Sequence, residues 1–219
     1  MKKTNLKIDW ATHDAAKYAC ENWHYSGCLP TGKIVKIGAW EDGKFIGVIL
    51  FSRGASPHLL TKYNLKQNEG CELTRVALTQ HKSQVTRIMK IAINFLKKVC
   101  PGIKIVISFA DPEEGHHGGI YQGGNWIYTG SSSPTIEYFV KGRWRHVRGA
   151  YYSKTEDTPT RKRVGKHRYV MPLIDSLKKK ILEYKQPYPK RAKQAMVDDQ
   201  STQRQCNTDQ HAPLSDNNV

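Results

Sequence analysis

The stretch CELTRVALTQHKSQVTRIMKIAINFLKKVCPGIKIVISFA, residues 71–110, decides the fold. Its first part, CELTRVALT, alternates apolar and polar side chains, which is typical of a half-buried strand. Apolar side chains in residues 85–99 recur at the 3.6-residue spacing of an amphipathic helix, which the Pro-Gly pair at 101–102 ends. The run IKIVISFA is almost entirely apolar and predicts a buried, central strand. The stretch therefore predicts two strands of one sheet joined by a helix.

The sequence on either side extends this unit into a larger sheet. Residues 6–10 predict a short strand, residues 12–23 a helix, and residues 34–52 a β-hairpin whose central Asp-Gly pair is a strong turn signal. The last two strands are expected at NWIYTG (125–130) and TIEYFVKGRW (135–144), after a short helix. This order predicts a mixed α/β (α+β) fold, in which helices cover both faces of a mainly antiparallel sheet.

The formal net charge of the chain is +16, and the basic residues are unevenly distributed along it. Residues 1–140 carry 17 Lys and Arg against 11 Asp and Glu, whereas residues 141–194 carry 17 against 4. A basic excess concentrated in one segment favours binding to a polyanion over a basic surface that only aids solubility. We therefore expect a main domain at 1–150, a basic C-terminal extension of a strand and a helix at 151–194, and a disordered, acidic tail at 195–219.

The cysteines and the N-terminus indicate the compartment. The five cysteines are odd in number and form no C-x-x-C pair, which argues against a disulfide framework or a zinc ribbon. The N-terminus lacks the apolar core of a signal peptide, and no apolar run approaches the ~20 residues that span a bilayer. We expect a soluble protein of a reducing cytoplasm, without a membrane partner.

The order of elements resembles the GNAT acyltransferase fold. CELTRVALT, the polar turn and the helix start lie where GNAT enzymes bind the coenzyme A pyrophosphate, and IYQGGNWIYTG is similar to their Tyr-bearing helix and following strand. The resemblance implies acetyl-CoA or a related small-molecule donor. The usual glycines of the GNAT turn are absent, so an ordinary capped helix is an equally good interpretation. The implied donor-binding residues are Val76, Leu78, Ser83, Gln84, Val85, Thr86 and Arg87.

A closer resemblance is to the Mom DNA-modification proteins of Mu-like bacteriophages. It is carried by NWHYS, EDGKFIGVILFSRGA, CELTRVALTQHKSQVTRIM, SFADPEEGHHGGIYQGGNWIYTG and GRWRH, and it covers about residues 6–150. It implies conversion of adenine N6 in double-stranded DNA to an N6-carbamoylmethyl derivative, which protects phage DNA from restriction in the host cytoplasm. The implied catalytic residues are His24, Tyr25, Arg75, Asp111 and Tyr121.

These residue types suit such chemistry, but each has an ordinary alternative. Asp111 follows a buried strand, where α/β sheets place ligand-binding groups, and could orient or deprotonate the amine; it could also be a turn residue. Tyr121 is a candidate general acid or a tyrosine at the edge of the core. Arg75 could bind an anion or a carboxamide, or form an internal salt bridge with Glu69 or Glu72.

The donor and the metal remain open. A carbamoylmethyl group is attached through a methylene, so simple attack on a thioester carbonyl cannot make the link. Either the donor differs, or a metal-assisted or radical step is needed. The Mom resemblance suggests iron, for which His24, His116 and His117 are candidate ligands together with Asp111, although no spacing requires a site. His24 could otherwise be a base or a polar surface group.

A reaction on N6 requires access to a base inside the duplex, which usually means base flipping. The aromatic side chains that could stack on a flipped base are Trp23, Tyr25, Trp126 and Tyr128, although most are expected in the core. The side chains expected to contact phosphates are Arg53, Arg143, Arg145, Arg148, Arg161, Lys162, Arg163, Lys166 and Arg168, with a second basic cluster at Lys178–Lys180.

Two other functions fit the sequence. The first is acyl-CoA-dependent N-acetylation of a protein or a small amine, against which the missing glycines and the basic segment count. The second is DNA binding without catalysis on a degenerate enzyme fold, against which the dense polar motifs in loops count.

Overall fold

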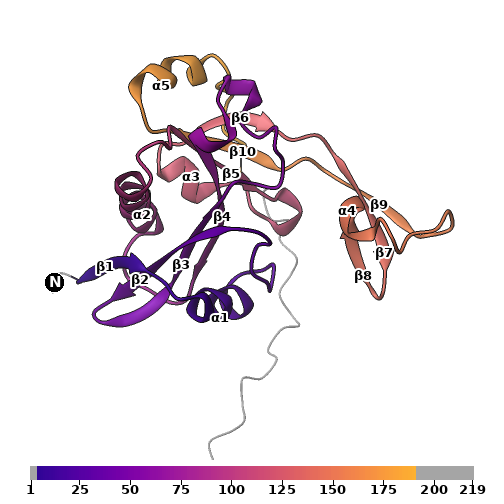
Figure 1. Ribbon diagram of the computed structural model, residues 1–219, viewed down its shortest axis with the longest axis horizontal. Coiled ribbons are helices and arrows are strands. Elements are labelled where there is room, and N and C mark those ends of the chain that lie inside the picture. Colours follow the sequence, from indigo (N-terminus) through magenta and orange to yellow (C-terminus); the bar gives the residue numbers. More distant parts are fainter. Residues whose placement is uncertain (1–3, 191–219) are drawn as a thin grey trace, which may run out of the picture.

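Two β-sheets organise the protein, and the computed structural model describes residues 4–190 (Figure 1). The large sheet contains, in spatial order, β1 (Leu6–Trp10), β2 (Ile34–Glu41), β3 (Lys44–Ser52), β4 (Gly70–Leu78), β5 (Ile105–Ala110), β10 (His167–Pro172) and β6 (Ile127–Ser131). The small sheet contains β8 (Arg143–His146), β7 (Thr135–Val140) and β9 (Thr160–Arg163). The helices are α1 (His13–Trp23), α2 (Val85–Val99), α3 (Gly119–Gly123), α4 (Val147–Ala150) and α5 (Asp175–Leu182), with 3-10 turns η1 (Thr61–Tyr63), η2 (Gln67–Glu69) and η3 (Pro112–Glu114).

The predicted fold class is confirmed. β4 and β5 pair in parallel, and the other neighbouring strands of the large sheet pair antiparallel. The stretch that decides the fold forms β4, α2 and β5, and the predicted hairpin forms β2 and β3. In the described part of the chain, no helix is long and apolar enough to cross a membrane.

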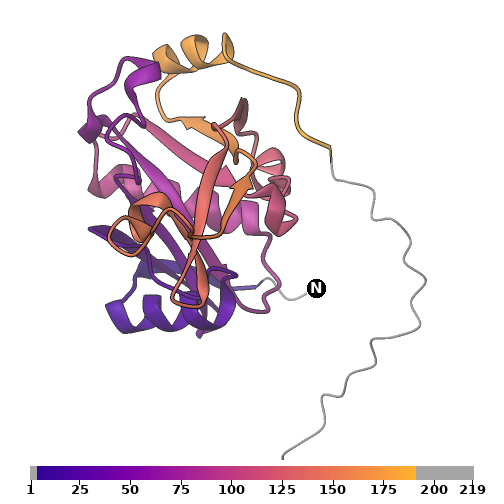
Figure 2. The ribbon, with the colours of Figure 1, turned by 90° about the vertical axis from the view of Figure 1, so that its right-hand side faces the viewer.

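Helices cover both faces of the large sheet because its strands alternate apolar side chains between the faces. Ile49 and Phe51 of β3 pack in the cluster that contains the apolar side of α2 and Tyr121 of α3. Val48 and Leu50 of the same strand pack on the other face against α1. That face also receives α5, which packs over β5 and β10. Seen from either side, α1 and α5 lie at opposite ends of the molecule (Figures 1 and 2).

The parallel pair β4–β5 opens along its length. The two strands pair only where residues 70–73 face residues 105–108, whereas β4 stays paired with β3 as far as Leu78. The carboxyl ends of β4 and β5 therefore diverge. Such ends are where α/β sheets place ligands, and this gap positions the site described below.

The C-terminal third differs from the expected arrangement. Residues 135–144 were expected to complete the main sheet but form the β7–β8 hairpin of the small sheet, which projects from the molecule together with α4 and β9 (Figure 1). We call this projection, residues 135–163, the arm. Residues 167–172 then return as β10 between β5 and β6. The expected extension therefore supplies an inner strand of the large sheet.

The strand and the helix expected in that extension are both present, as β10 and α5. Tyr169 and Val170 of β10 are fully buried, which explains why the strand belongs to the core despite the basic residues around it. The tail expected to be disordered, residues 195–219, lies outside the described residues, as do residues 191–194.

Candidate active site

A cavity of about 530 Å³ opens where β4 and β5 diverge. Its wall is formed by the end of α1, by β4 and β5, and by the loop that leads into α3. In that loop Gly118 has a φ of 84°, and a Cβ there would lie 2.3 Å from the Tyr169 ring, so the position requires glycine. The predicted catalytic residues and metal ligands that line the cavity are His24, Tyr25, Arg75, Tyr121, His116 and His117.

His24 follows α1 and is neutral. Ser26 donates its backbone N–H to Nδ1 of His24 at 3.1 Å, and the Ser26 hydroxyl lies 2.8 Å from the same nitrogen. Burial, together with the positive charges of Arg75 and His116, lowers the pKa of His24 to about 4. With Nδ1 acting as an acceptor, the proton of the neutral ring is on Nε2. His24 is therefore a hydrogen-bond donor at neutral pH rather than a ready base.

Two of the four aromatic residues expected to stack on a flipped base line the cavity. Tyr25 is 52% exposed, and its ring centroid lies 4.4 Å from that of His24 and 5.0 Å from that of His116. Trp23 also lines the cavity. The other two candidate stacking residues, Trp126 and Tyr128, are buried in the core cluster and are absent from the cavity wall. The geometry therefore leaves Trp23 and Tyr25 as aromatic groups for a planar ligand.

Arg75 is a partly buried cation in the wall of the cavity. It donates from Nη1 to the backbone oxygen of Thr74 at 2.8 Å, while its Nε is buried and has no hydrogen-bond partner in the described part of the protein. The alternative salt bridges are absent among residues 4–190: Glu69 pairs with Lys104, and Glu72 forms no ion pair with Arg75. A guanidinium in the wall of a cavity, without an ion-pair partner among the described residues, suits an anionic or carboxamide ligand.

Tyr121 is 8% exposed and hydrogen-bonded at the floor of the cavity. Its hydroxyl lies 2.8 Å from Oγ of Ser108, and its ring stacks on Tyr169 with centroids 5.0 Å apart. Burial raises the pKa of Tyr121 to about 12, so the phenol stays protonated and able to donate. Sequence reasoning missed Ser108, the fully buried partner. Its signal was a single hydroxyl within the apolar run of β5.

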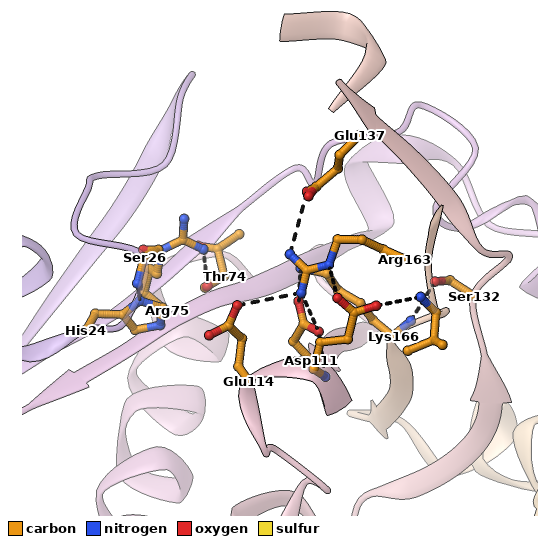
Figure 3. Close-up of polar contacts among 12 residues, drawn as sticks. His24, Ser26, Thr74, Arg75, Asp111, Glu114, Ser132, Glu137, Arg163 and Lys166 are labelled. Carbon is orange, nitrogen blue, oxygen red and sulfur yellow. Dashed lines mark hydrogen bonds and ion pairs between the residues drawn. The ribbon is translucent and has the colours of Figure 1, made fainter. Parts of the chain in front are cut away.

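Asp111 lies apart from His24 and Arg75 (Figure 3). It is 2% exposed, does not line the cavity, and pairs with Arg163 at 3.1 Å and with Lys166 at 3.0 Å. Burial acts to raise the pKa of Asp111, but the hydrogen bond and charge of Lys166 and the charge of Arg163 outweigh it and lower the pKa. The ionised carboxylate is therefore engaged with the base of the arm.

Arg163 is the centre of this charged group, which we call the Arg163 cluster. Its side chain is 14% exposed and lies within ion-pair distance of four carboxylates, those of Asp111, Glu113, Glu114 and Glu137. Arg163 and Lys166, both expected to contact DNA phosphates, are thus held in internal ion pairs. The cluster joins β9 and β7 of the arm to the turn that follows β5.

The remaining candidate DNA contacts are distributed over the surface. Arg143, Arg161 and Lys162 are exposed on the arm, although Arg161 also pairs with Glu137 at 2.7 Å. Arg145 and Arg168 are partly buried, Arg53 is exposed at the end of β3, and Lys178–Lys180 lie on α5. Arg148 lies in α4, and its side chain is outside the described part of the structure.

The residues before α2 do not fit a coenzyme A diphosphate. The carboxylate of Glu41, the last residue of β2, accepts the backbone N–H groups of Lys82 at 2.7 Å and Ser83 at 2.8 Å. These are N–H groups of the turn that was expected to bind the pyrophosphate. Of the predicted donor-binding residues, the cavity wall contains Val76, Leu78 and Val85 and does not contain Ser83, Gln84, Thr86 and Arg87.

The residues present also do not fit an iron centre. Within residues 4–190, no group of three or more His, Cys, Asp or Glu side chains is placed to hold a metal ion. His24 and His116 line the same cavity, but the Nδ1 lone pair of His24 is used by Ser26 and its Nε2 carries the proton. Its ring therefore offers no free lone pair to a metal.

Comparison with known proteins identifies the family. The chain is 24% identical over 203 residues to the methylcarbamoylase mom of Escherichia phage Mu, which covers 84% of each sequence. Among solved structures it is similar to the aminoglycoside N-acetyltransferase AAC(6')-Ib11, with 12% identity, a TM-score of 0.47 and coverage of 77% of this chain and 97% of that one. It is also similar to an acetyltransferase from Thermus thermophilus, with 12% identity, a TM-score of 0.42 and coverage of 77% and 97%. The family model of the Mom protein family matches residues 5–190, and this protein therefore belongs to that family.

Proposed function

We propose that this protein transfers a carbamoylmethyl group to N6 of adenine in double-stranded DNA, in the cytoplasm of a phage-infected host, and so protects phage DNA from restriction. The observation that carries the proposal is the cavity between β4 and β5, where His24, Tyr25, Arg75 and Tyr121 converge from separate elements. The name of the Mu relative, a methylcarbamoylase, supports the identity of the transferred group.

The cavity suits a base that has left the helix. Trp23 and Tyr25 offer aromatic faces on which a purine can stack. The neutral His24, through Nε2–H, and the protonated Tyr121 are donors that can bind the ring nitrogens of adenine, which are acceptors. Adenine is thus recognised by a planar, hydrogen-bonding pocket rather than by charge.

Arg75 is assigned to the group donor. Arg75 lines the cavity, and its guanidinium can bind the carboxamide oxygen of the group to be transferred. The described wall of the cavity contains no Asp or Glu side chain, so N6 has no carboxylate base beside it. We therefore place the activation on the donor: the N6–carbon bond forms at the methylene carbon, the leaving group departs with the electrons of its bond to that carbon, and this group takes up the proton that N6 releases.

The arm is assigned to the DNA duplex. Arg143, Arg161 and Lys162 expose cationic groups on β8 and β9, and such groups bind phosphates without sequence preference. The Arg163 cluster ties this surface to the turn after β5, beside the strand that borders the cavity. Asp111 acts in this proposal as a positioning residue, because it holds the arm and does not itself line the cavity.

The proposed function is tested by measuring whether adenine is modified in the DNA of cells that produce the protein. Plasmid DNA from expressing bacteria is digested to nucleosides and analysed by mass spectrometry for deoxyadenosine that is heavier by one carbamoylmethyl group. Arg75→Gln should abolish the product, whereas Lys17→Gln, an equal loss of charge on the exposed side of α1, should retain it. Unmodified DNA from cells with abundant, folded, DNA-bound protein would support noncatalytic DNA binding instead.

A further inference from the structure

Glu41 accepts two N–H groups of the turn that was expected to bind a pyrophosphate. It is the last residue of β2, lies next to the turn between β4 and α2, and is 7% exposed. Its two oxygens are used separately: Oε2 accepts from Lys82 N at 2.7 Å, and Oε1 accepts from Ser83 N at 2.8 Å. Two successive N–H groups of a turn can form an anion site, and here, in the turn just before the N-cap of α2, the anion is part of the protein.

The charge on Glu41 is stable at neutral pH. Burial acts to raise the pKa of Glu41, but the hydrogen bonds from Lys82 and Ser83 outweigh burial and lower it. The carboxylate therefore stays ionised where the positive end of the α2 dipole favours an anion. A diphosphate that approached these N–H groups would meet a negative charge within a few ångströms, and like charges at that distance repel strongly near a low-dielectric surface.

The side chains of the turn also hinder the close approach of a diphosphate to its backbone. Residues 79–84, TQHKSQ, contain no glycine, so side chains stand along the whole turn. Ser83 is buried, so its hydroxyl does not reach outward to a ligand. A diphosphate would have to displace the Glu41 carboxylate, which would leave a charged group without its partners.

We propose that Glu41 determines donor specificity by excluding molecules that are held through a diphosphate, coenzyme A thioesters included. The donor is then a compound that enters the cavity without an anchored diphosphate and presents a carboxamide or carboxylate oxygen to Arg75. This inference extends the proposed function, but it concerns ligand binding alone. It can fail while DNA modification is confirmed, and it can hold if DNA modification is not found.

The experiment compares two probes that differ in the diphosphate-bearing part of one molecule. Coenzyme A and pantetheine are titrated into the full-length protein at physiological ionic strength by calorimetry, while the amide resonances of Lys82 and Ser83 are followed by NMR. The variants are Glu41→Ala, which frees both N–H groups, and Glu41→Gln, which keeps the side-chain volume but removes the charge. Asp42→Asn is the matched control, because it removes a carboxylate one residue away that accepts from Asn5 instead.

In the wild type and in Asp42→Asn, coenzyme A should bind no more than about twofold more tightly than pantetheine, and the two amide resonances should not move. In Glu41→Ala or Glu41→Gln, the diphosphate should improve affinity by roughly tenfold or more, with movement of both resonances. Wild-type protein that binds coenzyme A about tenfold more tightly than pantetheine through these amides overturns the proposal. Folded Glu41 variants that gain no preference for coenzyme A overturn it as well.

Discussion

Arg163 Nη2 lies 3.1 Å from Oδ2 of Asp111, in an ion pair that links the last strand of the arm to the turn after β5. Both side chains are buried or nearly so, and the pair spans 52 residues of sequence. The same guanidinium contacts three further carboxylates. The orientation of the arm therefore depends on a buried charge network. A substitution at Asp111 should alter the position of Arg163, and a substitution at Arg163 should alter that of Asp111.

We expect Asp111→Asn and Arg163→Gln to cause similar defects. Each leaves partners of a buried ion pair unmatched, at a cost of about 1–3 kcal/mol of unfolding free energy, because the remaining members of the Arg163 cluster compensate in part. DNA modification should fall in both variants. Urea unfolding and nucleoside mass spectrometry are the measurements, with the double variant completing a mutant cycle in which the effects are far from additive.

The competing view is that Asp111 acts directly on the substrate amine. It would be favoured if Asp111→Asn abolished modification with normal stability while Arg163→Gln remained active. Lys17→Gln, exposed on α1, serves as the control for loss of a charge outside the network.

The neutral state of His24 makes stability depend on pH in a defined window. The pKa of His24 is lowered from 6.5 to about 4 in the folded protein. Between these values the unfolded chain binds a proton more readily than the folded chain. The contribution of neutral His24 to the free energy of unfolding is therefore fully present above pH 6.5 and is lost as the pH falls through about 4. We expect the loss of urea stability between about pH 7 and pH 5 to be smaller in His24→Gln than in the wild type.

The control for this titration is His13→Gln, an exposed histidine at the start of α1. An unchanged pH dependence in His24→Gln would mean that the ring is not protected from protonation in the fold. It would also remove the reason for treating His24 as a donor rather than a base.

The role of the Tyr121 hydroxyl at the floor of the cavity can be tested by substitution. We expect Tyr121→Phe to fold normally, because the ring keeps its stacking on Tyr169, and to lose modification activity by about 10²-fold if the phenol donates in the reaction. Tyr63→Phe is the matched control, since it removes another buried tyrosine hydroxyl, which lies 3.4 Å from Thr129 on the other side of the sheet. Equal activity in the two variants would show that the Tyr121 hydroxyl is structural.

Local patterns predicted the elements well because they depend on near neighbours in sequence. The alternation in β4, the period of α2 and the apolar run of β5 specify strand, helix and strand. The position of a cavity where β4 and β5 end also follows, since the ends of neighbouring parallel strands form one edge. These inferences need no knowledge of distant partners.

Distant pairings were not predictable in this way. Glu41 lies 42 residues from Ser83, and nothing in the hairpin sequence shows that its last carboxylate points at a helix start. Arg163 and Lys166 were interpreted as surface cations because composition reports charge and not partners. For the same reason β10 was assigned to an appendage: a strand sequence gives its faces but not its neighbours.

The exposed basic side chains of the arm should set the affinity for DNA and its salt dependence. We expect the triple variant Arg143→Gln, Arg161→Gln and Lys162→Gln to weaken binding to duplex DNA, and to reduce the slope of log affinity against log salt by roughly 0.9 for each phosphate contact removed. Fluorescence anisotropy over a series of salt concentrations measures both quantities. A variant with Lys178→Gln and Lys179→Gln on α5, at the other basic cluster, is the control and should change the slope little. If the α5 variant lost as much slope as the arm variant, the duplex would lie across α5, and the arm would not be the surface that presents DNA to the cavity.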